Sequence, residues 1–440
     1  MQRVRCVAAV LGATALMFPA SAAAADVLYV KAARVIVDAG RPALTPGAVI
    51  ITDGVVTAVG PAIAAPAGAR QIDLETLTIL PSLVDAHTHL GAGPAGAMPG
   101  QPQPIPSPAY AALRAQKNVE SALKLGVAAM RVLGTGDFLD VAMKNAIDDG
   151  TIPGPHLVPA GNPLGVVGGH TDRYPMPVAI QLLDYYTPLN GFVASPADAE
   201  KAVQLQIKYG ARVIKLMASG GVGSPLDYPT DPNLTLEEMK AAIDQAHMHH
   251  IKVAAHAENL TSIMDAMKAG IDSIEHGSEL NQEAVDYMKA HSVTFVPTVA
   301  VAVRTAGPGT APSGPPMSPF SQYKAKLNLD QHIASFQLAL KSGVNMAAGS
   351  DDSYGPTSTG VIAELLADVD HGMTPRQAVE SATTRGARLL GLGNLGTLAP
   401  GMEGDLLAVD GDPLADIHAL ERIRLVVFKG KVVTDTTKAR

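Results

Sequence analysis

The sequence has one cysteine, no tryptophan and few aromatic residues. The single cysteine, Cys6, lies in an N-terminal apolar stretch, so the rest of the chain can form neither a disulfide framework nor a thiolate nucleophile. Aromatic residues make up 4% of the chain, whereas hydrophobic residues make up 47%. The core of this protein must therefore be packed mainly by Ala, Val, Leu, Ile and Met.

The chain also lacks a basic stripe and a long run of Lys or Arg. It has 33 basic and 41 acidic side chains, which give a net charge of -8 and a pI near 5.9. Nucleic acid is therefore not an expected partner. Beyond the N-terminal stretch, no segment has the length and polarity of a transmembrane helix, so a membrane is not an expected partner either.

Residues 1–25 differ in character from the rest of the sequence. Arg3 and Arg5 precede an apolar run over residues 7–18, and small residues follow at 21–25. The run is short for a membrane span and ends in a site typical of signal peptidase. We predict a cleaved secretory signal over residues 1–25 and export of the mature chain to a periplasm or the medium. An uncleaved anchor is the alternative.

The two ends of the chain share a pattern of short apolar strands separated by turns. Such strands are expected at residues 27–30, 34–37, 48–51, 55–59, 406–409 and 425–428, with a tight hairpin turn at Asp53 and Gly54. This pattern predicts a small β-sandwich domain formed from both chain ends, residues 26–80 plus 386–440.

The middle of the chain, residues 81–385, alternates apolar strands with helical patterns. Such alternation is typical of parallel βαβ units. Eight strand candidates are visible, the first ending at His89 and the last at Asp351. The predicted fold class is therefore α/β, a (β/α)8 TIM barrel with a small β-sandwich. Gly/Pro-rich loops at residues 91–108 and 306–319 are expected to cover the face where active sites lie.

Side chains that can bind metal stand at the ends of several of these strands. His87 and His89 are two residues apart, so on a strand they point to one face and can reach one metal ion. Asp85 lies on the same face and is expected to orient a ligand or support the strand. A His pair at this spacing is weak support on its own.

Lys215 is the unusual member of the set, because a protonated lysine would repel a metal ion. Burial lowers the pKa of a lysine, and a neutral amine can add carbon dioxide to form an anionic carbamate that bridges two metals. The alternative is a lysine that extends to solvent. The position of Lys215 between strands that end in His favours the carbamate.

His256, His276 and Asp351 complete the predicted metal ligands, together with His87, His89 and Lys215. His256 and His276 end the two strands after Lys215 and would bind a second divalent metal. Asp351 ends the last strand, where it can bind a metal, accept the proton of a bridging water and pass it to a leaving amine. These ligands suit zinc, although manganese, nickel and cobalt also accept them.

The residues around these ligands resemble those of a known family. The segment 80–89, which contains His87 and His89, resembles the opening motif of the amidohydrolase superfamily, and the later ligands match its binuclear, carboxylated-lysine subtype in order. The segments 168–170, 213–225 and 401–405 are similar to the imidazolonepropionase-related branch, which includes Xaa-Pro dipeptidases and ochratoxin-hydrolysing enzymes. Ser82 and the segment 131–134 depart from the family pattern without touching a proposed ligand.

The resemblance spans about residues 50–430 and implies hydrolysis of an amide by a metal-bridged hydroxide, commonly with zinc. It implies a small-molecule or dipeptide substrate that releases a C-terminal amino acid, ochratoxin A being one example, and a homo-oligomer. His170 and Tyr228 are the further catalytic candidates, since each follows a strand on the expected catalytic face. Arg173 and Arg304 are candidates to bind a substrate carboxylate.

Two other functions remain open on the sequence. A cyclic-amide hydrolase of the imidazolone type would use one metal and typically lacks the bridging lysine, so Lys215 counts against it. A catalytically silent binding protein on the same scaffold is opposed by the intact set of ligands. Counting metal ions per chain separates the first alternative from the leading hypothesis.

Overall fold

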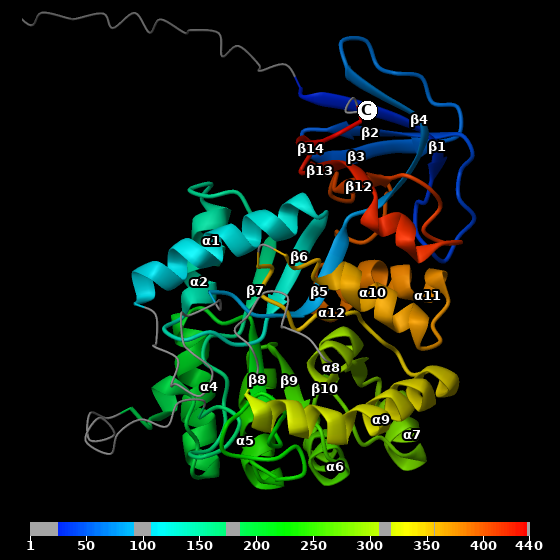
Figure 1. The fold of residues 1–440 in the computed structure, drawn as a ribbon. Coiled ribbons are helices and arrows are strands. Elements are labelled where there is room, and N and C mark those ends of the chain that lie inside the picture. The colour runs from blue at the N-terminus through cyan, green and yellow to red at the C-terminus, as the bar shows by residue number, and fades with distance from the viewer. Residues whose placement is uncertain (1–24, 92–106, 173–184, 308–317, 356, 438–440) are drawn as a thin grey trace, which may run out of the picture.

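A computed structural model describes residues 25–91, 107–172, 185–307, 318–355 and 357–437. The predicted signal, Arg173 and most of the two Gly/Pro-rich loops lie outside these residues. The described chain forms a sheet built from both chain ends and a larger α/β part between them (Figure 1). Among the described helices, none combines the length and hydropathy that a bilayer crossing requires.

The sheet from the chain ends has seven strands in the order β14-β13-β12-β4-β1-β2-β3. Its members are β1 (Val27–Val35), β2 (Gly47–Thr52), β3 (Val55–Gly60), β4 (Arg70–Pro81), β12 (Leu406–Val409), β13 (Ile423–Phe428) and β14 (Lys431–Asp435). β4 joins the two ends, because it pairs in parallel with β1 and in antiparallel with β12. The hairpin turn between β2 and β3 has left-handed φ values of 50° at Asp53 and 83° at Gly54, as the expected tight turn requires.

The sheet curls until its β3 edge meets the chain that leads into β12. The backbone N–H of Val56 donates to Met402 at 2.8 Å, and that of Gly404 donates to Gly54 at 2.7 Å. Strands from both ends share one buried cluster that includes Val30, Ile79 and Leu425. The predicted contribution of both ends to one β unit agrees with this sheet, while the domain boundaries stay a prediction.

The middle of the chain contains two parallel sheets. One has the order β5-β6-β7 and the other β11-β10-β9-β8. Their strands are β5 (Leu83–Thr88), β6 (Val127–Val132), β7 (His156–Pro159), β8 (Val213–Met217), β9 (Lys252–Ala257), β10 (Ser273–His276) and β11 (Thr294–Val296). Nearly all their residues are buried, as expected for strands covered on both faces.

Isolated backbone bridges connect the two sheets. Leu164, just after β7, pairs with Leu216 of β8, and Met346 and Asp352 pair with Phe295 and Thr88 respectively. The segment 345–352, predicted as the eighth strand, thus lies between β11 and β5 without forming a continuous strand. In the described chain, seven of the eight predicted parallel strands are regular.

Helices separate the strands and follow local capping signals. They are α1 (Pro108–Lys124), α2 (Leu139–Asp148), α4 (Pro196–Tyr209), α5 (Leu236–Met248), α6 (Leu260–Ala269), α7 (Gln282–His291), α8 (Val299–Ala306), α9 (Pro319–Ser342), α10 (Val361–Asp370), α11 (Pro375–Glu380) and α12 (Gly386–Leu390). Thr235 and Glu238 form a capping box at the start of α5, and Asn259 caps α6. Gly270 ends α6 in the left-handed region, which favours glycine. The loops after β8, β9 and β10 lie close together, because Val222 and Ser278 both donate to Glu258, at 3.3 and 3.1 Å.

Candidate metal centre

A small cavity at the carboxyl ends of the parallel strands gathers the predicted ligands. It is lined by His87, His89, His170, Lys215, Met217, His256, His276 and Asp351. Ligand atoms of His87, His276 and Asp351 lie within 4.8 Å of one another, although they come from three separate strand ends. The structure thus brings together all six residues predicted to bind metal, and His170 with them.

In the first His pair, His87 and His89, the Nδ1 atom of each ring has a hydrogen-bond partner in the protein. His87 Nδ1 lies 2.9 Å from Glu275 Oε2, and His89 Nδ1 lies 3.1 Å from the carbonyl oxygen of Gly134. The Nε2 atoms of His87 and His89 lie 3.6 and 3.1 Å from the same oxygen of Asp351. The Nδ1 atoms face acceptors, so in the tautomer with the proton on Nδ1 both Nε2 atoms would be able to bind a metal ion beside the Asp351 oxygen.

In the second His pair, His256 and His276, one ring nitrogen of each histidine also has a hydrogen-bond partner in the protein. His256 donates from Nε2 to the carbonyl oxygen of Gly220 at 2.9 Å, which leaves its Nδ1 free of a proton. His276 Nδ1 lies 2.8 Å from the hydroxyl of Thr298, and its ring lies 4.6 Å from that of His256. His276 and Asp351 have φ values of 69° and 50°, a conformation that costs energy and is frequent at functional sites.

Lys215 lies in the middle of β8 with 1% of its surface exposed. Burial, followed by the charge of Lys215, lowers the pKa of His87 to about 4 and that of His256 to about 3. Both imidazoles are therefore neutral at pH 7, as metal ligands must be. A cationic ammonium in this position opposes metal binding, whereas an anionic derivative of the same amine would support it.

Asp351 is ionised, and its backbone is fixed by Asp85. Although burial disfavours the charge, His87 and His89 hold the pKa of Asp351 well below its ordinary value. Asp85 accepts hydrogen bonds from the N–H and hydroxyl of Ser350 at 3.0 and 2.6 Å and from the hydroxyl of Tyr354 at 2.7 Å. Asp85 thus connects β5 to the segment that presents Asp351, which is the supporting role considered for it from sequence.

Glu275 and Arg131 form a buried ion pair that the sequence analysis did not identify. Glu275 Oε1 accepts from Arg131 at 2.7 Å, while Oε2 accepts from His87. Burial alone would raise the pKa of Glu275, but Arg131 and His87 lower it to about 2. The carboxylate therefore fixes the His87 ring. Two charged residues inside otherwise apolar strands were the available signal.

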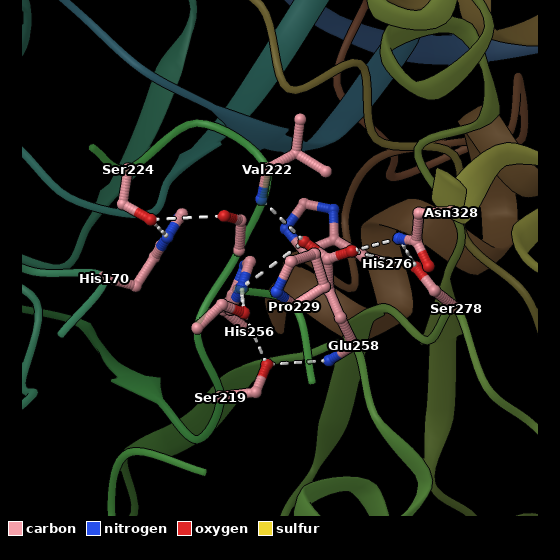
Figure 2. Close-up of polar contacts among 12 residues, drawn as sticks. His170, Ser219, Val222, Ser224, Pro229, His256, Glu258, His276, Ser278 and Asn328 are labelled. Atoms are coloured by element: carbon pink, nitrogen blue, oxygen red, sulfur yellow. Dashed lines mark hydrogen bonds and ion pairs between the residues drawn. The ribbon is translucent and has the colours of Figure 1, made fainter. Parts of the chain in front are cut away.

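His170 and Tyr228 occupy different positions relative to the cavity. The His170 ring stacks on that of His256 at 4.1 Å, and its Nδ1 lies 3.0 Å from the hydroxyl of Ser224 (Figure 2). The side chain of Tyr228 is 45% exposed, packs against Phe320 and does not line the cavity. Arg304 forms an ion pair with Asp352 at 3.3 Å. The roles of His170, Tyr228 and Arg304 stay predictions.

A buried polar stripe on α9 contacts the loops around the cavity. Its members are the buried Lys324, His332 and Ser335 and the half-buried Asn328, spaced as one helical face. Asn328 donates to Glu258 and to Ser278 (Figure 2). Ser335 donates to the carbonyl oxygen of Ser278 at 2.7 Å. Burial raises the pKa of Glu258 to about 7. The sequence analysis missed this stripe, whose signal was a row of polar residues at helical spacing.

A second group of possible ligand atoms lies at the opposite end of β7. His156, Glu403 and Asp405 each place one such atom within 4.8 Å of the others. His156 Nε2 already contacts Glu403 Oε2 at 2.7 Å. This group therefore acts as a hydrogen-bonded contact between β7 and the chain that enters β12.

The chain is similar to known amidohydrolases in both its sequence and its structure. The sequence model of the amidohydrolase family matches residues 78–433. Ochratoxinase from Aspergillus niger is 32% identical over 433 residues, covering 93% of this chain and 87% of that protein. Imidazolonepropionase from Rhodococcus jostii (strain RHA1) is 26% identical over 383 residues, with 82% of each chain covered.

Two solved structures superimpose over nearly the whole chain. A Xaa-Pro dipeptidase with methionine bound in its active site has a TM-score of 0.84 and 28% identity, covering 92% of this chain and 99% of its own. The A. niger ochratoxinase structure has a TM-score of 0.82 and 28% identity, covering 94% and 96%. These similarities confirm the branch predicted from the motifs.

Proposed function

We propose, from the premise that this chain belongs to the amidohydrolase family, that it hydrolyses the amide bond to a C-terminal amino acid in dipeptides or N-acyl amino acids. Members of this family are hydrolases that act on C–N bonds, and this chain is one of them. The observation that supports the finer proposal is the convergence of four imidazoles, Lys215 and Asp351 on one cavity.

The donor atoms suit a pair of divalent cations, and we propose zinc. His87, His89 and Asp351 would hold one cation, and His256 and His276 the other. The amine of Lys215 would add to carbon dioxide, forming an N–C bond and releasing a proton, and the resulting carbamate would bridge the pair. A bound pair of this kind lowers the pKa of a water molecule and polarises a carbonyl group.

Asp351 is the proposed proton carrier. Its carboxylate is ionised, so it can accept a proton from the attacking water and return that proton to the departing amine. His170 lines the cavity with its ring stacked on that of His256, where we propose that it contacts the substrate or the tetrahedral oxyanion. Tyr228 reaches that oxygen only if its ring leaves Phe320. Arg304 is the proposed partner for a substrate carboxylate, in exchange with Asp352.

The parallel strands are proposed to form a closed (β/α)8 barrel. The bridges at Leu164, Met346 and Asp352 support it, since they join the two sheets at both of their edges. In a barrel the carboxyl ends of all strands meet on one face, which explains how residues from β5, β8, β9 and β10 reach one cavity. Export after cleavage of residues 1–25 and a homo-oligomeric state are further proposals, which rest on the N-terminal pattern and the family resemblance.

The proposed substrates are those for which the relatives are named. An ochratoxinase and a Xaa-Pro dipeptidase are among them, so N-acyl phenylalanines such as ochratoxin A and Xaa-Pro dipeptides are the compounds to offer first. The imidazolonepropionase relative makes a cyclic amide the second candidate. The presence of Lys215 in the cavity favours the first, because the bridging carbamate belongs to a two-metal centre.

The test is to load the purified protein with zinc and offer N-acyl-Phe, Xaa-Pro and imidazolone compounds. We expect release of free amino acid and two metal ions per chain by elemental analysis. Asp351→Asn should lower kcat by about 10² to 10⁴-fold while the protein keeps at least one metal ion. Opening of the imidazolone alone, with one metal ion per chain, would overturn the proposal in favour of the second candidate.

A further inference from the structure

Lys324 is a buried lysine whose ammonium group is enclosed by backbone carbonyls. It lies on α9 with 1% of its surface exposed. Its Nζ donates to the carbonyl oxygens of Gly221, Ser224 and Asp227, each at 2.7 Å. An ammonium has three N–H donors, so these three acceptors satisfy it completely.

The three carbonyls belong to one loop, residues 219–231, between β8 and α5. This loop contacts two imidazoles of the metal centre. The carbonyl oxygen of Gly220 accepts the proton of His256 Nε2, and the hydroxyl of Ser224 lies 3.0 Å from His170 Nδ1 (Figure 2). The position of this backbone therefore decides which nitrogen of His256 carries the proton and how the His170 ring is turned.

The backbone of the loop lies directly against the imidazoles. A Cβ atom on Gly221 would lie 2.4 Å from Cε1 of His170 and 2.8 Å from Cε1 of His256. Within the loop, the N–H of Gly221 donates to Asp227 at 3.4 Å, and from outside it Glu258 accepts from the N–H of Val222 at 3.3 Å. Lys324 adds the one cationic donor among these contacts, and it meets the loop on both sides of Ser224.

Hydrogen bonds from a charged donor are about twice as strong as neutral ones, and burial strengthens them further. Burial lowers the pKa of Lys324, whereas the nearby carboxylates of Asp227 and Glu258 raise it. A neutral side chain of the same length would leave three carbonyl oxygens without their donor. The loop would then shift toward water.

We propose that Lys324 is a positioning residue for the metal centre, which acts through the 219–231 loop to fix the His256 tautomer and the His170 ring. The inference rests on the proposed metal-dependent function of this site. Lys324 does not touch the cavity, since it is absent from the residues that line it. It acts by keeping His256 Nδ1 free of a proton and directed toward the metal.

The test compares Lys324→Met with Lys326→Met, a matched control on the exposed side of the same helix. Hydrogen–deuterium exchange of the metal-free proteins reports on the loop, and stepwise zinc titration reports on the two metal sites. We expect the 219–231 amides of Lys324→Met to exchange at least about tenfold faster and its second zinc ion to bind about 10 to 100-fold more weakly. The first zinc ion, and both properties of Lys326→Met, should be unchanged.

Lys324→Gln serves as a second variant, because its amide retains two N–H donors on a shorter stem. It should give an intermediate effect, and it keeps the test usable if the methionine variant does not fold. Neither measurement needs a substrate, so a wrong substrate proposal leaves this test intact. Unchanged loop exchange and unchanged second-zinc affinity in a folded Lys324 variant would overturn the inference, as would equal weakening of both zinc ions.

Discussion

Replacing Glu275 by Gln changes one oxygen to an amide nitrogen and removes a buried charge. The side chain is 0% exposed, with Arg131 on one oxygen and His87 on the other. The substitution leaves the Arg131 guanidinium buried without its counter-ion. It also offers His87 Nδ1 an N–H donor in place of an acceptor, which favours the tautomer with the proton on Nε2 and so blocks metal binding there.

The loss in stability of Glu275→Gln can be estimated from the buried ion pair and from the pKa of Glu275. Removing one partner of a buried ion pair costs about 3–5 kcal/mol. The pKa of Glu275 falls from 4.5 to about 2 on folding, which corresponds to about 3 kcal/mol. Because the folded pKa is lowered, this stability is present above pH 4.5 and is lost as the pH falls toward 2. We therefore expect Glu275→Gln to lower the free energy of unfolding by about 3 kcal/mol at pH 7.

The assay is urea unfolding of the metal-free protein at pH 7, with zinc titration of the folded state. Glu275→Gln should also bind zinc about 10 to 100-fold more weakly, as other substitutions that disturb the orientation of a ligand do. The double variant Arg131→Met/Glu275→Gln removes both charges and should be more stable than Glu275→Gln alone. A single variant within about 1 kcal/mol of the wild type, or a double variant no better than the single, would refute the reasoning.

Three further outcomes are expected. Among the described residues, neither carboxylate oxygen of the fully buried Asp368 has a hydrogen-bond partner, and burial raises its pKa to about 8. Because the folded state holds this proton more tightly than the unfolded state, the wild type should lose stability as the pH rises from 4 to 8. Asp368→Asn should lose less stability over the same range, which thermal unfolding at both pH values would measure. Burial lowers the pKa of His87 to about 4 and of His256 to about 3, so the metal-free protein should lose stability as the pH falls from 6.5 to 4, whereas bound zinc should protect it in the same scan. Tyr228→Phe should leave stability within about 0.5 kcal/mol, since the ring is exposed, and a fall in kcat of tenfold or more would place its hydroxyl on the substrate.

The four histidines proposed as metal ligands were accessible from sequence because each stands at or next to the end of an apolar strand. Parallel strands bring their carboxyl ends to one face, so His87 and Asp351 could be expected together despite their separation along the chain. The same argument applies to Lys215, whose burial follows from its position inside β8. The sequence pattern and the family motifs agreed on these residues.

Side chains that act from behind the ligands were harder to find. Glu275 and Arg131 come from β10 and β6, which do not pair with each other, so no spacing along the chain indicates their contact. Lys324 lies in the first turns of α9, directly after the segment 306–319 that was expected to be a loop. Its partners are carbonyl oxygens, which leave no trace in the sequence.

The sequence also did not predict how loop side chains are oriented or where strand pairing stops. Tyr228 follows β8 as expected, yet the loop turns its ring outward onto Phe320. The segment 345–352 has the apolar pattern of a strand, but its pairing is limited to single bridges and it turns sharply at Asp351. Periodicity predicts which face a residue occupies and does not predict where pairing stops.

The shared sheet has a consequence for how the polypeptide is made. β4 leaves the ribosome early, yet β12, the partner for its last residues Thr78–Pro81, is synthesised more than three hundred residues later. Until then that end of the strand presents an open edge, which is a template for pairing with another molecule. Any shortened product that lacks β12 would keep that edge, and aggregation of nascent or truncated chains should begin there.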